Sequence, residues 1–221
     1  MRRALWITLR AAAIMLAMEA IEARAAIIDR IAVSVGNRVI TASDLDREIR
    51  ITAFLNNAKP DFSAANKRQT AGRMVDQTLV RAEIEVSRYL LPTAAEIDAA
   101  LKELKNRYPD EAAYRGALAQ YGISEDDLKT MLLWQLTLVR FIDARFRPGV
   151  QIGDEDIRKY FNEHVRPTLE QAHPGKSASL DDYREGIEQT LTGEAANQQV
   201  EVWLKDARGR TRIDYHEEVF R

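Results

Sequence analysis

The chain has 221 residues, of which 46% are hydrophobic and 30% are charged, and its formal net charge at pH 7 is −2. This composition is typical of a globular protein, and the balanced charge without a long run of one sign argues against nucleic acid as a partner. The lack of cysteine excludes disulfide bonds, thiol catalysis and cysteine-ligated zinc.

The first 25 residues have the pattern of a secretory signal peptide. Arg2 and Arg3 precede an apolar run at 11–18, and residues 23–25, Ala-Arg-Ala, fit a small-x-small cleavage site. We therefore expect cleavage after Ala25 and export to the periplasm. No second apolar run is long enough to cross a bilayer, so no stable membrane insertion of the mature chain is expected. The alternative is an amphipathic helix that the mature protein retains.

The mature chain opens with two strand-like runs. Residues 31–35 and 38–40 are rich in β-branched side chains, and Gly36-Asn37 between them predicts a tight hairpin. A lone hairpin is marginally stable in water, so it needs a further strand or a covering helix. Residues 211–215 are strand-like too, and we expect them to pair with the hairpin and complete a small antiparallel sheet.

Between the hairpin and the last strand, capping residues and helical spacing of apolar residues predict about seven helices. The fold class is therefore mainly α with a small antiparallel sheet. Pro167 to Ser179 is the only stretch that we expect to be an extended loop. The predicted helices span about 41–56, 64–90, 94–107, 110–120, 124–147, 153–164 and 179–208.

The order of these segments resembles the SurA-type periplasmic chaperones. The segment IDRIAVSVGNRVITASDLDREI (28–49) is similar to the family's opening hairpin and first helix. Residues 92–98 and 121–128 resemble two later helix starts, and 182–215 resembles the C-terminal helix and closing strand. The resemblance implies an ATP-independent chaperone that binds unfolded outer-membrane client polypeptides in an apolar helical cradle.

The chain departs from this family at one point. Family members usually carry parvulin-type prolyl isomerase domains before the C-terminal helix, whereas only the short linker 165–178 stands there in this chain. A domain needs at least about 50 residues, so no isomerase fits and no catalytic residue is carried over. We expect one chaperone domain over 26–221, with an N-terminal helical part (26–163) and a C-terminal part (179–221) that completes its core.

The predicted helix at 124–147 carries more apolar side chains than one core-facing stripe requires. The surplus side chains either bind apolar client segments or fill the core, if this helix is central and buried all round. The candidate client-binding residues are Phe54, Tyr114, Met131, Trp134, Leu138 and Phe141.

Other interpretations remain open. A non-catalytic adaptor that binds one folded periplasmic partner is the main alternative, and a prolyl isomerase is a remote one. Surplus apolar positions also permit a homodimer. No cofactor motif is present, and the three histidines, His164, His173 and His216, have no metal-binding spacing, so we expect neither a cofactor nor a metal.

Overall fold

The computed structural model describes residues 29–87, 89–172 and 179–221. The predicted signal peptide lies outside the described residues. The fold is mainly helical with a small three-stranded antiparallel sheet, which confirms the predicted fold class. In the described part, no helix is long and apolar enough to cross a membrane.

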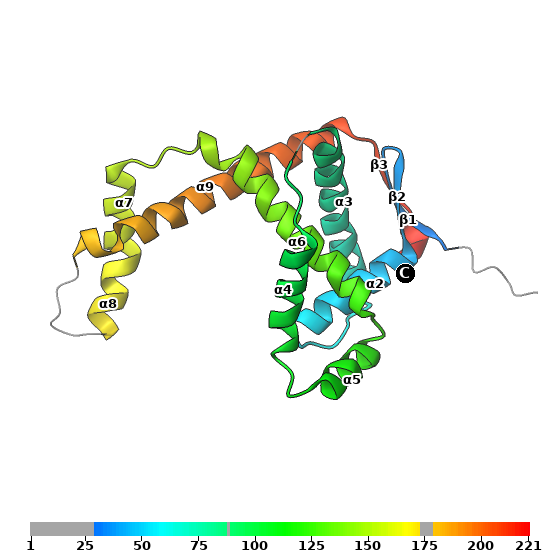
Figure 1. The fold of residues 1–221 in the computed structure, drawn as a ribbon. Helices are drawn as coiled ribbons and strands as arrows, with labels where there is room; N and C mark the ends of the chain where they lie inside the picture. The colour runs from blue at the N-terminus through cyan, green and yellow to red at the C-terminus, as the bar shows by residue number, and fades with distance from the viewer. Residues whose placement is uncertain (1–28, 88, 173–178) are drawn as a thin grey trace, which may run out of the picture.

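The sheet brings the two ends of the described chain together. Strand β1 (Ile31–Val35) pairs with β2 (Arg38–Thr41) across a turn in which Gly36 has a φ of 59°. Strand β3 (Ile213–Tyr215) pairs antiparallel with the other edge of β1, so the strand order is β2-β1-β3. The predicted pairing of the closing strand with the hairpin is therefore confirmed (Figure 1).

Five helices follow the hairpin, and local capping chemistry sets where they begin. Thr41, Thr93 and Ser124 each form a capping box with the acidic residue three positions later. Gly122 ends its helix in the left-handed conformation, with a φ of 65°. The helices are α2 (Ala42–Leu55), α3 (Ala64–Val86), α4 (Ala94–Lys105), α5 (Glu111–Tyr121) and α6 (Glu125–Arg145).

The second predicted helix was too long at its C-terminal end. Helix α3 stops at Val86, where Ser87 leaves the helical conformation with ψ near 150°. The segment that leads from there to α4 is held from outside, because Arg140 of α6 donates a hydrogen bond of 2.6 Å to the carbonyl oxygen of Leu91. This contact joins residues 49 positions apart in the chain, so local sequence does not reveal it.

The prediction of an extended loop from Pro167 to Ser179 was wrong for residues 167–172, which are helical. Helix α7 (Asp154–Tyr160) continues through a π-helical turn, η2 (Phe161–Val165), into α8 (Arg166–Ala172). Pro167 lies just after the π-helical turn, and the wider hydrogen-bond spacing of that turn accommodates a proline that lacks the backbone N–H. If α7, η2 and α8 are taken as one continuous helix, the described residues contain seven α-helical segments, the last being α9 (Leu180–Arg210).

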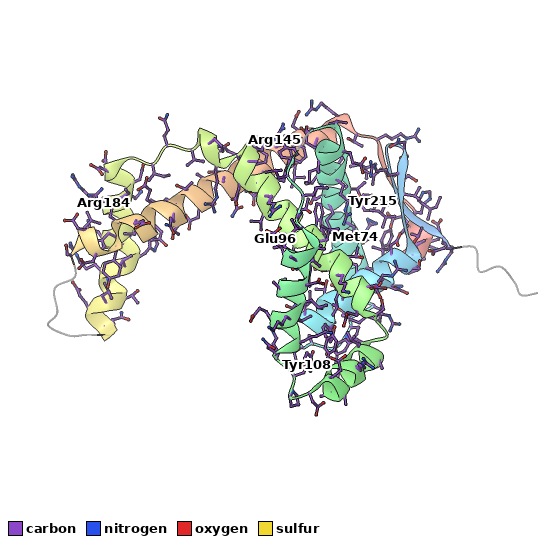
Figure 2. The ribbon with its side chains drawn as sticks, in the orientation of Figure 1. Met74, Glu96, Tyr108, Arg145, Arg184 and Tyr215 are labelled. Atoms are coloured by element: carbon purple, nitrogen blue, oxygen red, sulfur yellow. The ribbon has the colours of Figure 1, made fainter. Side chains whose placement is uncertain are left out.

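Figure 1 shows a body and an arm that projects from it. The arm consists of α7, η2, α8 and the first half of α9, and the second half of α9 packs on α3 and α6 of the body. Arg184 lies on the arm and Tyr108 lies at the far end of the body (Figure 2). At the junction, Arg145 at the end of α6 donates a hydrogen bond of 2.7 Å to Glu83 of α3.

Within the described residues, the body holds three clusters of buried apolar side chains and the arm holds a fourth. The first cluster joins the sheet to α2, α3 and the end of the chain, the second lies around α4 and α5, and the third lies between α3, α6 and α9. Their central members are, in that order, Val33, Leu45 and Phe220; Phe54, Tyr114 and Leu128; Trp134, Phe141 and Ala196; and, in the arm, Ile157, Phe161 and Ile187.

Candidate functional site

Most of the side chains that the sequence suggested for client binding belong to these cores. Met131 and Leu138 are half-buried. The other four are 6% exposed or less, so of the two alternatives left open by the sequence, groove or core, they belong to the core: Phe54, Tyr114, Trp134 and Phe141. Helix α6 carries surplus apolar residues because different stretches of it pack against different elements, so its apolar surface is wider than one stripe.

Aromatic contacts explain why these side chains are buried. The Phe141 ring makes edge contacts with Tyr89, Phe146 and Trp203, at centroid distances of 5.3, 5.6 and 5.6 Å. Such contacts add about 0.5–1.5 kcal/mol each beyond the burial of apolar area. These rings join α6 to α9 and to the α3–α4 segment, which makes them structural residues in this conformation.

Apolar side chains are instead exposed at the C-terminal end of α3 and on the segment that leads to α4. We call Val86, Tyr89, Leu90 and Leu91 the linker patch. Val86, Leu90 and Leu91 are 82%, 86% and 56% exposed. A hollow of about 710 Å³ adjoins the patch; it is lined by Tyr89, Leu90, Leu91, Thr93, Arg140, Asp143 and Ala144.

A second site, which we call the three-helix pocket, lies between α2, α3 and α6. Its volume is about 230 Å³. Charged and polar side chains come from all three helices, and the apolar part is made by an isoleucine, two methionines and a tryptophan. The lining residues are Asp44, Arg47, Glu48, Ile51, Met74, Gln77, Arg81, Asp127, Thr130, Met131 and Trp134.

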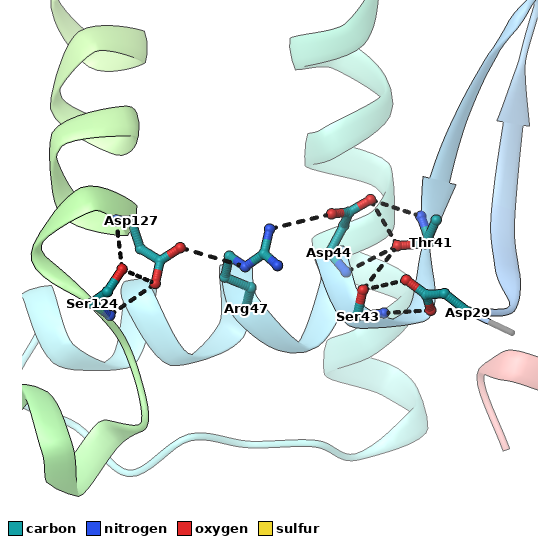
Figure 3. Close-up of polar contacts among 7 residues, drawn as sticks. All are labelled: Asp29, Thr41, Ser43, Asp44, Arg47, Ser124 and Asp127. Atoms are coloured by element: carbon teal, nitrogen blue, oxygen red, sulfur yellow. Dashed lines mark hydrogen bonds and ion pairs between the residues drawn. The ribbon is translucent and has the colours of Figure 1, made fainter. Parts of the chain in front are cut away.

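One wall of the three-helix pocket is built from the starts of two helices. Arg47 lies between two carboxylates, with its Nη1 atom 3.6 Å from Asp44 Oδ1 and its Nε atom 3.5 Å from Asp127 Oδ1 (Figure 3). Asp44 and Asp127 also complete the capping boxes of α2 and α6. Both acids are therefore fixed by their own helices, and Arg47 is occupied by them.

Glu48 and Arg81 also line the three-helix pocket, but among the described residues neither is held by an oppositely charged side chain as Arg47 is. The Arg81 guanidinium lies 4.5 Å from the centre of the Trp134 ring, in a cation–π contact. Glu48 is half-buried, and its Oε1 atom is 3.5 Å from the Gln77 amide nitrogen. Within the described part of the chain, neither Glu48 nor Arg81 takes part in an ion pair.

The environment of the two groups perturbs their protonation. Burial raises the pKa of Glu48, although the Gln77 hydrogen bond and the nearby Arg73 and Arg81 charges oppose this. Desolvation lowers the pKa of Arg81, and the charge of Glu48 opposes that shift. Glu48 is half-buried, so its charged form lacks part of its hydration, whereas Arg81 is exposed and keeps access to water at the mouth of the pocket.

A third arrangement lies on the sheet. Ser34 Oγ is 3.3 Å from His216 Nε2, and His216 Nδ1 is 3.9 Å from Glu218 Oε1. The order resembles a nucleophile, a base and a carboxylate. However, Ser34 lies on the central strand and pairs with Val39 on one side and Asp214 on the other. Backbone N–H groups engaged in a sheet are not free to stabilise an oxyanion, so this arrangement does not support acyl transfer.

The sequence contained little that could have identified the three-helix pocket. Glu48 is spaced three residues after Leu45 and three before Ile51, both of which are buried. A carboxylate on the apolar face of a helix is the one available signal.

In the described residues, no group of three or more histidine or acidic side chains is arranged to hold a metal ion. No protein-family model matches the chain, and no curated protein matches it in sequence.

Proposed function

We propose that this chain is an ATP-independent, holdase-type chaperone of the periplasm that binds unfolded, exported client polypeptides. The observation that carries the proposal is the linker patch, in which three large aliphatic side chains are more than half exposed within six residues of sequence. Contiguous exposed apolar surface on a globular protein is typical of an interaction site.

The chemistry of the linker patch suits apolar segments of varied sequence. The side chains Leu90 and Leu91 offer aliphatic contact, and Arg140 is occupied by the segment's own carbonyl oxygens and by Glu96. Few directional polar groups therefore remain to select one partner sequence. Burying an exposed leucine contributes about 1.5–3 kcal/mol, and an unfolded client loses conformational entropy when it is captured. Binding should be weak and reversible without ATP.

The arm supports the same proposal by its construction. Helix α7 and the π-helical turn η2 pack on α9 rather than on the body, and the chain enters the arm through the short segment that follows α6. An arm joined to a body in this way presents surface on more than one side to an extended polypeptide. Its exposed Tyr183, at 36%, adds an aromatic side chain.

Suppression of aggregation tests the proposal. An outer-membrane porin and an unrelated unfolded protein are diluted from urea with and without the chain, and light scattering is followed. We expect lower scattering for both clients, and loss of the effect in the double variant Leu90→Ser/Leu91→Ser. The matched control Val39→Ser/Val202→Ser removes two other exposed aliphatic side chains and should keep the effect.

Three outcomes count against the proposal. Equal aggregation with and without the chain contradicts chaperone activity, and unchanged protection by the double variant removes the linker patch as the site. Capture of one stoichiometric folded partner, without protection of unfolded clients, supports the adaptor interpretation. Catalysis in a proline-peptide isomerisation assay contradicts the assignment as a non-enzyme.

A further inference from the structure

The three-helix pocket is separate from the linker patch, and no lining residue belongs to both. Its charged groups fall into two sets. Asp44, Arg47 and Asp127 neutralise one another in the wall, as Figure 3 shows. Glu48 and Arg81 remain as one carboxylate and one guanidinium that face the pocket without an ion-pair partner in the described chain.

This pair sets the chemistry of a complementary ligand. A ligand with a cationic or N–H donor group satisfies Glu48, and one with an anionic or carbonyl acceptor satisfies Arg81. A ligand with only one of these groups leaves the other protein group without a partner. Both groups line the same pocket, and among the described residues they form no ion pair with each other, so one ligand that carries both kinds of group can satisfy them together.

The remaining lining determines what the rest of the ligand looks like. Ile51 and Trp134 are 5% and 6% exposed, and Met74 and Met131 are partly buried beside them. These side chains favour an aliphatic group, and methionine adapts to different shapes. A volume of about 230 Å³ corresponds to roughly eight water molecules, which is the scale of one amino acid and not of a nucleotide.

We propose that the three-helix pocket binds a free α-amino acid with an aliphatic side chain, with its ammonium group on Glu48 and its carboxylate on Arg81. The aliphatic side chain lies against Met74, Met131 and Trp134. Arg81 is positioned for this role because its cation–π contact with Trp134, another lining residue, holds the guanidinium beside the pocket. This site is independent of the chaperone proposal.

Nuclear magnetic resonance of the full-length, ¹⁵N-labelled chain tests this proposal. The probes are L-leucine, N-acetyl-L-leucine, which lacks the cation, and L-leucinamide, which lacks the anion. We expect a saturable shift of the Trp134 indole N–H with L-leucine, and binding at least about tenfold weaker for both blocked probes. The Trp203 indole, which does not line the pocket, should not move and serves as an internal control.

Two variants assign the ends of the ligand. Glu48→Gln should weaken L-leucine binding about tenfold and remove the preference over N-acetyl-L-leucine. Arg81→Gln should also weaken L-leucine binding about tenfold, and it should remove the preference for L-leucine over L-leucinamide. Glu103→Gln, on an exposed position of α4 outside the pocket lining, is the matched control and should bind L-leucine as the unchanged chain does.

The proposal is overturned if L-leucine gives no saturable shift up to about 10 mM, because the dissociation constant would then lie above the millimolar range. It is also overturned if the three probes bind equally to the unchanged chain, a comparison that does not depend on how the variants fold. Because the linker patch does not take part, failure here leaves the aggregation result unaffected.

Discussion

Two polar side chains, Glu48 and Tyr114, illustrate what burial does at the scale of single residues. Burial raises the pKa of both groups. Glu48 opens onto the three-helix pocket, so a ligand has access to it. The Tyr114 side chain is 1% exposed, and its hydroxyl has no partner in hydrogen-bond geometry among the described residues, although the Glu125 carboxylate lies close enough to contribute to the raised pKa. Desolvation of a polar group therefore indicates a binding site at Glu48, whereas at Tyr114 it only lowers the stability of the fold.

The substitution Tyr114→Phe should stabilise the fold. An unpartnered buried hydroxyl costs about 1–3 kcal/mol, and the ring contacts with Tyr108 and Lys105 do not require the oxygen. The Tyr114 pKa, raised to about 12, keeps the phenol neutral at physiological pH, so the gain should not vary with pH in that range. We expect the free energy of unfolding in urea to rise by about 1 kcal/mol.

The control for this prediction is Tyr121→Phe, which alters a half-buried tyrosine that packs edge-on against Phe54 in the same cluster. Its unfolding free energy should stay within about 0.5 kcal/mol of the unchanged chain. A clear loss of stability in Tyr114→Phe, with no loss in the control, would mean that the hydroxyl makes a hydrogen bond after all.

At the scale of elements, the sequence predicts helix starts better than helix ends. A capping box such as Ser124 with Asp127 lies within four residues, so it can be read locally. The end of α3 carries no such signal, because the apolar pattern continues to Leu90 and the segment is held by Arg140 from a distant helix. Pro167 indicates the start of a loop in the sequence, but the π-helical turn before it lets the helix continue past a proline.

Gly116 inside α5 and Gly122 directly after it provide a matched test of local backbone chemistry. Gly122 has a φ of 65°, and a Cβ there would lie 2.9 Å from Arg50 Nη1, whereas Gly116 has open space around its Cα. We expect Gly122→Ala to lower the unfolding free energy by about 1–2 kcal/mol because of the left-handed conformation. Gly116→Ala should raise it by up to about 1 kcal/mol through higher helix propensity. Urea unfolding of both variants measures the two effects. A change of unfolding free energy in the same direction for both variants would contradict the prediction.

At the scale of the whole molecule, the sheet that joins the chain ends was predictable and the pocket was not. Strand propensity at 31–35 and 211–215 could be recognised in each segment separately, and a hairpin's need for a third strand suggested the pairing. The three-helix pocket instead depends on how α2, α3 and α6 pack, because Glu48, Arg81 and Trp134 share no sequence spacing. The exposed linker patch was missed because its residues continue the apolar face of α3 in sequence.

The division into body and arm also became visible only in three dimensions, and it has a consequence for unfolding. The arm's buried cluster of Ile157, Phe161 and Ile187 shares no buried member with the clusters of the body. Between them, α9 contains Gly193, whose neighbourhood leaves open space for a Cβ. A glycine inside a helix lowers helix stability by about 1 kcal/mol relative to alanine, so it marks a weak point between the two cores.

Hydrogen–deuterium exchange should therefore separate the two parts. Phe161→Ala removes a side chain that is 2% exposed, and such a change costs about 3–5 kcal/mol in the core that contains it. We expect faster exchange in α7, η2, α8 and the part of α9 before Gly193, with unchanged exchange in α2 to α6. The matched variant Phe141→Ala should accelerate exchange throughout the body. If Phe161→Ala accelerates exchange equally in both parts, the arm and the body unfold as one cooperative unit, and a client that binds the arm must then stabilise the body to the same extent.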